Sequence, residues 1–291
     1  MSEPQIILEK SGSVARITFD NPSAFNALTS GMWQDLADAA RDVTADSNIR
    51  VVVFRGVGGK AFVSGTDISG FAKFTSGADG VDYETRIDAC MRALDEISAT
   101  TIAVVDGWCV GGGLNIASAC DFRIATPEAR FGSPIGRTLG NCLSALSVAR
   151  IGAAIGVSVA KRMLLLGEII PAKEMMTNGF LLEVVEQEAI DGCVDNLCKR
   201  AAENAPLTTA ACKEVLRRMT LENLPDADDV ISQVYGSEDF RRGVEIFLGK
   251  TKTLPEWTGR EGLTRQRVQF ADLSGGGTAG VWKNCNLGGM T

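Results

Sequence analysis

The stretch Gly107-Trp-Cys-Val-Gly-Gly-Gly-Leu-Asn-Ile-Ala-Ser-Ala-Cys-Asp-Phe-Arg-Ile-Ala125 decides the fold. The segment before it, 101–106, is typical of a buried strand, and the apolar segment 112–119 predicts a helix that begins within three glycines. A strand that passes through glycines into a helix presents free backbone N–H groups at the helix N-terminus, where the helix dipole favours negative charge. The stretch therefore predicts a place where an oxyanion is held.

The composition narrows the class of protein. The chain has 291 residues, 45% of them hydrophobic, and a formal net charge of −7. This length allows a large core, and the negative charge argues against non-specific binding to nucleic acid. No apolar run is long enough to cross a bilayer, and the polar segment 1–5 lacks the features of a secretory signal. We expect a cytoplasmic protein whose partners include neither nucleic acid nor membrane.

The sequence contains no histidine. This absence excludes a Ser-His-Asp triad, a Cys-His dyad and any metal site with histidine ligands. Any catalytic proton transfer must use a carboxyl group, tyrosine, cysteine, lysine or water. The eight cysteines mostly lie in apolar segments without a Cys-x-x-Cys pair, so we expect reduced thiols and no metal site.

Hydrophobic periodicity predicts a recurring strand–strand–helix unit. A hairpin is expected from strands at 6–10 and 14–19, joined at 11–13. The segments that follow alternate between the two kinds of element: a helix after 29, a strand at 51–54, a helix at 84–98, a strand at 101–106, a helix at 112–119, a strand at 122–125, and helices at 141–151 and 157–166. After about residue 188 the pattern is that of amphipathic helices alone.

Four further segments accompany the opening stretch: Asn21-Pro-Ser-Ala-Phe-Asn-Ala-Leu28, Gly59-Lys-Ala-Phe-Val-Ser-Gly-Thr-Asp-Ile68, Phe131-Gly-Ser-Pro134 and Ser237-Glu-Asp-Phe-Arg-Arg-Gly-Val-Glu-Ile-Phe-Leu-Gly-Lys250. Together the five resemble the crotonase (enoyl-CoA hydratase/isomerase) superfamily, in the family's order, over roughly residues 5 to 260. The resemblance implies an α/β fold, a crotonase-like spiral of ββα repeats with a C-terminal helical region. Because this superfamily varies its chemistry on one scaffold, the resemblance indicates the fold more strongly than the reaction.

We expect three parts in the chain. Residues 1–190 form the ββα spiral core with an acyl-CoA site, and 191–260 form a C-terminal helical region that the resemblance associates with oligomerisation. The implied assembly is a homotrimer or a dimer of trimers. The segment 261–291 contains the linker-like run Ser274-Gly-Gly-Gly-Thr-Ala-Gly280 and lies beyond the resemblance. We attach no function to this Gly-rich tail.

The resemblance implies two oxyanion donors, the backbone N–H groups of Thr66 and Gly112. One such donor is typically worth about 2.7–4 kcal/mol of transition-state stabilisation. The alternative is that these glycine-rich turns only permit tight backbone geometry. Because both turns occur in the proper order, we favour the oxyanion hole.

The same resemblance implies an acyl-CoA substrate, with coenzyme A as part of the substrate and no separate cofactor. Serine stands at position 23, where the family often has a basic residue, which removes one expected phosphate contact. Phe247 and Lys250 match residues that approach the adenine end, often from a neighbouring subunit. The expected substrate-binding residues are Ser23, Ala24, Ser64, Gly65, Asp67, Ile68, Ile135, Phe247 and Lys250.

The sequence departs from the family's hydratases, which use two glutamates. Asn115 and Ile135 stand at those two positions, and neither side chain transfers a proton at neutral pH. The downstream spacing is shifted by about one residue, so Gly136 or Arg137 is the alternative occupant of the second glutamate's space. A carboxylate general base typically contributes about 10²–10⁴-fold to the rate. Efficient hydration of a simple enoyl-CoA is therefore not expected.

Several side chains are candidates to replace the missing glutamates. Arg137 could pair with an acidic acyl group, and Asn115 could orient a water molecule. One of Tyr83, Glu84 and Asp88 could supply the proton, whereas an inert thiol is expected at Cys142. Two of these residues have a structural alternative. Arg137 could be a surface charge, and Asn115 could be a satisfied polar group.

Three functions remain open. The first is an acyl-CoA-processing enzyme of the enoyl-CoA hydratase/isomerase type, a lyase or isomerase that stabilises a thioester enolate in the oxyanion hole. The second is a decarboxylase of a malonyl-type CoA thioester, and the third is a non-catalytic acyl-CoA binding protein. A nucleotide-binding loop at Gly56-Val-Gly-Gly-Lys60 is disfavoured because the Gly-Lys-Ser/Thr ending is missing.

Overall fold

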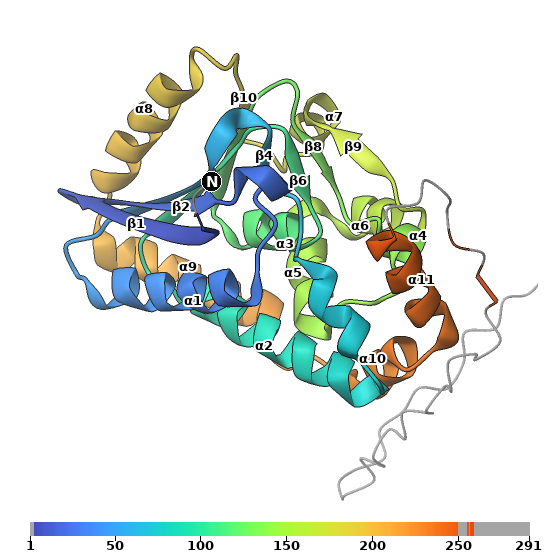
Figure 1. Ribbon diagram of the computed structural model, residues 1–291. Coiled ribbons are helices and arrows are strands. Elements are labelled where there is room, and N and C mark those ends of the chain that lie inside the picture. Colours follow the sequence, from blue (N-terminus) through green and yellow to red (C-terminus); the bar gives the residue numbers. More distant parts are fainter. Residues whose placement is uncertain (1–2, 250–254, 256, 259–291) are drawn as a thin grey trace, which may run out of the picture. The chain divides into compact units, whose positions relative to one another are not determined.

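The computed structural model describes residues 3–249, 255, 257 and 258 (Figure 1). The described residues belong to one compact unit. The Gly-rich tail and Lys250 lie outside the described residues, and the division of the remainder at residue 190 stays a prediction.

A six-stranded sheet forms the centre of the fold. Its order is β1-β2-β3-β5-β7-β10, in which β1 and β2 make the predicted antiparallel hairpin and the later strands run parallel. Its strands are β1 (Gln5–Ser11), β2 (Val14–Asp20), β3 (Val51–Gly56), β5 (Thr100–Val105), β7 (Phe122–Ala125) and β10 (Glu183–Val184). All six side chains of β5 are buried, as expected for a parallel strand covered on both faces.

A second, four-stranded sheet was not predicted. Its order is β4-β6-β8-β9, from β4 (Ala61–Val63), β6 (Trp108–Val110), β8 (Arg130–Gly132) and β9 (Ile169–Pro171). Each of β4, β6 and β8 follows a strand of the larger sheet along the chain, and a helix comes next. The predicted spiral of ββα repeats is therefore confirmed, and it is built by strands that alternate between two sheets.

The two faces of the larger sheet are covered by different helices. Side chains of Phe54 and Val105 pack with α1 (Ser30–Ala45) and α2 (Gly77–Asp95), whereas Val53 and Val104 pack under α8 (Ile190–Ala202). Figure 1 shows α8 on one face of the sheet and α1 on the other. This division follows from the two-residue period of the strands.

The C-terminal region is helical, as predicted: after α8 come α9 (Pro206–Leu221), α10 (Asp228–Tyr235) and α11 (Glu238–Leu248). α10 and α11 pack on α2 and on the 3-10 helix η3 (Ile68–Lys73) through Phe71, Tyr83, Tyr235 and Phe240. No helix among the described residues is long and apolar enough to span a membrane.

Two helices begin at other residues than predicted. α2 starts at Gly77 rather than at 84, because Ser76 and Asp79 form a capping box there. The glycines of its first turns allow close approach of α10. A Cβ on Gly80 would lie 2.2 Å from Cγ of Tyr235. α5 (Ala145–Ile155) starts after 141, with Ser144 as its N-cap, so Cys142 precedes the helix.

Candidate active site

The first glycine-rich turn directs the N–H of Thr66 away from the neighbouring chain. The N–H of Leu28 donates to the carbonyl of Gly65 over 2.9 Å, and the N–H of Asp67 donates to the carbonyl of Leu28 over 2.8 Å. Thr66 lies between these two bonds, so its own N–H points to the other side, because successive N–H groups of extended chain alternate in direction. Gly65 has a φ of 120°, a backbone conformation that residues other than glycine rarely adopt.

The second turn places the start of α3 (Gly112–Ala119) beside the first. The first hydrogen bond of this helix runs from the N–H of Asn115 to the carbonyl of Gly111 over 3.1 Å, so the N–H of Gly112 has no partner within the helix. A Cβ on Gly112 would lie 2.9 Å from Trp33 and 3.6 Å from Oγ1 of Thr66. The two predicted oxyanion donors therefore belong to adjacent turns.

Both turns open onto a cavity of about 210 Å³. Its wall is mainly apolar and combines the two turns with α2, η3 and α4 (Ile135–Thr138). It brings together the predicted residues Ser64, Gly65, Thr66, Ile68, Gly112, Asn115, Ile135 and Phe247. Phe247 reaches this cavity from the chain's own α11.

Four predicted residues do not line the cavity: Ser23, Ala24, Asp67 and Arg137. The segment 23–24 adjoins it, because the hydroxyl of Ser64 donates to the carbonyl of Ala24 over 3.1 Å. Asp67 is exposed and caps η3, accepting from the N–H of Ser69 over 2.9 Å.

Arg137 does not reach the cavity. Its side chain is exposed, and its stem lies 3.0 Å from where a Cβ on Gly167 would stand. Arg137 is therefore a surface charge, the structural alternative given for it above.

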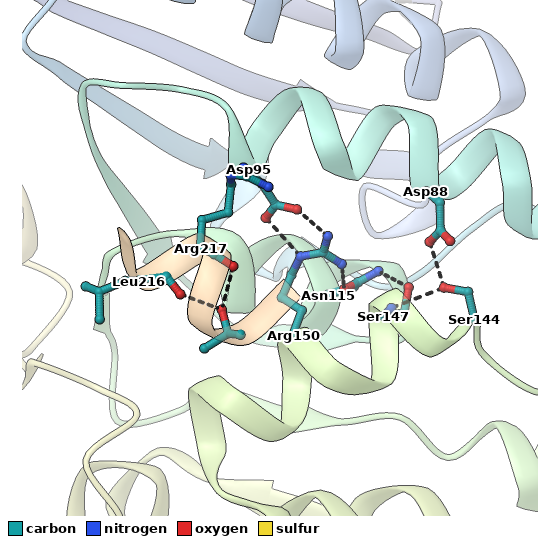
Figure 2. Close-up of polar contacts among 9 residues, drawn as sticks. Asp88, Asp95, Asn115, Ser144, Ser147, Arg150, Leu216 and Arg217 are labelled. Atoms are coloured by element: carbon teal, nitrogen blue, oxygen red, sulfur yellow. Dashed lines mark hydrogen bonds and ion pairs between the residues drawn. The ribbon is translucent and has the colours of Figure 1, made fainter. Parts of the chain in front are cut away.

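Asn115 is held on both sides of its amide (Figure 2). Its Nδ2 donates to Oγ of Ser147 over 2.9 Å, and Nη1 of Arg150 donates to its Oδ1 over 3.1 Å. Arg150 is 3% exposed and forms a two-bond ion pair with Asp95, with distances of 3.0 and 2.5 Å. Asn115 thus links a buried ion pair to Ser147, which lines the cavity.

Glu84 is the buried carboxyl of this site. It lies on α2 and lines the cavity with a side chain that is almost fully enclosed. The hydroxyl of Tyr235 donates to Oε1 over 2.7 Å, and the N–H of Ser144 donates to Oε2 over 3.0 Å. Burial raises the pKa of Glu84 to about 7, although these two hydrogen bonds act in the opposite direction. A carboxyl with this pKa both accepts and releases protons at neutral pH.

The other candidates have different positions. The hydroxyl of Tyr83 donates to Oγ1 of Thr66 over 3.1 Å, and burial raises the pKa of Tyr83, so it stays a neutral donor. Nε1 of Trp33 donates to the same oxygen over 3.2 Å, and the two bonds fix the Thr66 turn. Asp88 is not part of the cavity wall, and burial raises the pKa of the Cys142 thiol to about 12, which leaves it unreactive.

Sequence reasoning missed both partners of Glu84. Tyr235 is 151 residues away along the chain, and no local pattern connects the two. Ser144 had a signal, because its hydroxyl accepts from the N–H of Ser147 as a helix cap and serine is a preferred residue at that position.

Residues 9–260 match the family model described as "Enoyl-CoA hydratase/isomerase". The chain belongs to the enoyl-CoA hydratase/isomerase family. The predicted type, an acyl-CoA enzyme of this family with a crotonase fold, is thereby confirmed. Among the described residues no group of Cys, Asp and Glu side chains is arranged to hold a metal ion.

Three relatives illustrate the family's range. A short-chain-enoyl-CoA hydratase of Clostridium acetobutylicum is 29% identical over 85% of this chain and 95% of its own length. An (E)-benzylidenesuccinyl-CoA hydratase of Thauera aromatica is 35% identical over 72% of this chain and 80% of its own. A crystal structure of methylmalonyl-CoA decarboxylase with 2S-carboxypropyl-CoA has a TM-score of 0.79 at 26% identity, over 89% of this chain and 100% of that one.

Proposed function

We propose that this protein moves a proton between C2 and C4 of the acyl chain of an enoyl-CoA, with Glu84 as its single carboxyl acid–base group. The observation that carries the proposal is the position of Glu84: among the described residues that line the cavity, it is the only Asp or Glu. The cavity wall also holds Thr66 and Gly112, whose N–H groups are the proposed oxyanion donors.

The reaction that fits one carboxyl group best is movement of a double bond. Ionised Glu84 takes a proton from C2 of a 3-enoyl-CoA, and the C–H electron pair moves into the thioester to form a dienolate. The N–H groups of Thr66 and Gly112 stabilise the negative oxygen. Glu84 then returns the proton to C4, and the electrons restore the carbonyl with a double bond between C2 and C3. Atoms and charge balance without a further reactant.

The absence of both hydratase glutamates is part of this proposal. Asn115 and Ile135 both line the cavity, which supports their assignment to the two glutamate positions. Asn115 holds Ser147 in place, and Ile135 adds apolar wall. Hydration of crotonyl-CoA is consequently expected to be slow beside isomerisation.

Decarboxylation of a malonyl-type thioester is the second candidate, favoured by the likeness to methylmalonyl-CoA decarboxylase. The described cavity wall includes no Lys or Arg to pair with the departing carboxylate. Ionised Glu84 would repel that group. The site therefore fits a neutral acyl group better.

Calorimetry and turnover test the proposal. Crotonyl-CoA and acetyl-CoA should bind saturably, and Glu84→Gln should bind them with similar affinity while losing about 10²–10⁴-fold in isomerisation of but-3-enoyl-CoA. Glu84→Gln with full turnover would refute the role of Glu84. Binding without turnover of enoyl- or malonyl-CoA thioesters would identify a non-catalytic binding protein instead.

A homotrimer or dimer of trimers in the cytoplasm completes the proposal. α9 supports an assembly, because it carries the exposed apolar side chains of Leu207, Val215, Leu216 and Met219. A solitary chain would leave this apolar surface in water.

A further inference from the structure

We infer that Glu84 exchanges its proton with bulk water through a second cavity. This cavity is separate from the one of about 210 Å³ beside Thr66 and Gly112, which is called the acyl cavity here because the acyl group of the proposed substrate would lie in it. The inference rests on the proposed function of Glu84. The second cavity has a volume of about 440 Å³ and lies between α2, the start of α5 and the segment 221–231. Glu84 is the only described residue that lines both cavities.

The two cavities differ in character. The acyl cavity is lined by Ile68, Phe71, Ile87, Leu139 and Leu143 among others, and a bound acyl chain would displace water from it. The second cavity is lined by charged side chains: Asp88, Arg92, Glu222, Asp226 and Asp228 in addition to Glu84. Its volume and its polar wall suit ordered water, which needs both space and hydrogen-bonding partners.

Ser144 gives the polar wall continuity from the buried carboxyl towards solvent. Its N–H donates to Oε2 of Glu84 over 3.0 Å, and its hydroxyl donates to Oδ1 of Asp88 over 2.6 Å. Figure 2 shows this contact between Ser144 and Asp88. Asp88 is partly exposed, so the polar wall that begins at Glu84 extends to solvent. Burial raises the pKa of both carboxyls, and that of Glu84 reaches about 7.

This route has a measurable consequence. While the dienolate is bound, Glu84 carries the proton that it took from C2 of the substrate. It either returns to C4 of the same molecule or exchanges with solvent first. The deuterium content of crotonyl-CoA formed from but-3-enoyl-CoA in D₂O therefore measures exchange against return.

Filling the second cavity tests the inference. Thr85→Phe and Ala227→Phe each add a ring at its wall, and Thr85→Val is the matched control without added bulk. We expect the Phe variants to form crotonyl-CoA at a rate near that of the unmodified protein, with severalfold less deuterium per product. Asp88→Asn should lower the deuterium content as well, whereas Asp82→Asn, an exposed position on the same helix that lines neither cavity, should not.

The outcomes separate the two proposals. Unchanged deuterium content in both folded Phe variants, or product without deuterium from the unmodified protein, overturns the exchange route and leaves Glu84 as the base. Full turnover by Glu84→Gln overturns the proposed function. Thermal melting identifies any variant that fails to fold. If the Phe variants do not fold, the deuterium content with Asp88→Asn, which adds no bulk, tests the exchange route. If the unmodified protein shows no isomerisation and no exchange of the C2 protons of butyryl-CoA in D₂O, both proposals are overturned.

Discussion

Nη1 of Arg150 donates a hydrogen bond to Oδ1 of Asn115 over 3.1 Å, beside the wall of the acyl cavity. Asp95 already neutralises this buried cation through two hydrogen bonds. A neutral amide at position 115 accepts a hydrogen bond from Nη1 of Arg150 without adding a second negative charge. The contact gives a physical reason why asparagine is stable at this position, which we assign to one of the two hydratase glutamates.

Restoring the carboxylates is expected to raise hydration. Asn115→Glu with Ile135→Glu should increase the rate of crotonyl-CoA hydration by about 10-fold or more, below the full range of a general base because Arg150 keeps the pKa of a carboxyl at 115 low. Absorbance of the conjugated thioester measures the rate, and Asn115→Gln is the neutral control. Fast hydration by the unmodified protein would contradict our assignment of both positions.

Breaking the buried ion pair should destabilise the fold. Arg150→Met leaves Asp95 without its cation in a site where both side chains are less than a tenth exposed, at an expected cost of about 3–5 kcal/mol in the free energy of unfolding. Arg217→Met is the control, because its pair with Glu214 is more exposed and should cost at most about 1 kcal/mol. Urea unfolding measures both, and equal costs would argue against a structural role of the buried pair.

The N–H of Gly112 is expected to be essential for activity. Gly112→Pro removes this N–H but keeps a backbone shape that the first position of a helix accepts. Gly112→Ala keeps the N–H and adds a Cβ close to Trp33. Isomerisation should fall by about 10²–10³-fold more in the proline variant than in the alanine variant. Similar losses in both would indicate that crowding against Trp33, not the N–H, is responsible.

Stability should fall as pH rises through the titration of Glu84. Its pKa is raised from 4.5 to about 7 in the folded state, so between these values the folded chain binds a proton that the unfolded chain has released. The free energy of unfolding therefore decreases by about 3 kcal/mol from about pH 5 to pH 8, through this group. Glu84→Gln should remove that decrease in urea titrations. In the unmodified protein, kcat/KM should rise with pH as the base ionises, with a midpoint at about pH 7.

The assembly is testable by size. Light scattering should give three or six times the chain's 30.8 kDa. Replacing the two most exposed apolar residues of α9, Leu207 at 84% and Met219 at 77%, by lysine should weaken association. Leu166→Lys, at an exposed site on the C-terminal end of α6 (Val157–Leu165), is the control. A stable monomer before any substitution would contradict the prediction.

Local pattern alone predicted much of the fold. The hairpin, the parallel strands and α3 carry strong periodic signals, because each buries a regular face within one element. The strands of the second sheet have three residues each, too few to show a period, so they became visible only when β4, β6 and β8 paired. The start of α2 was missed since its glycines serve contact with α10, which lies far along the sequence.

For the candidate site, the sequence determined the family, the two glycine-rich turns and the absence of histidine. Those features are local residue types in a fixed order. The tertiary structure supplied the reasons for which we propose Glu84 rather than Asp88, Tyr83 or Arg137. Glu84 is enclosed, accepts hydrogen bonds from Tyr235 and Ser144, and lines two cavities. All three features depend on elements that are distant in sequence. A pKa is set by such surroundings, so no pattern along the chain could single out Glu84.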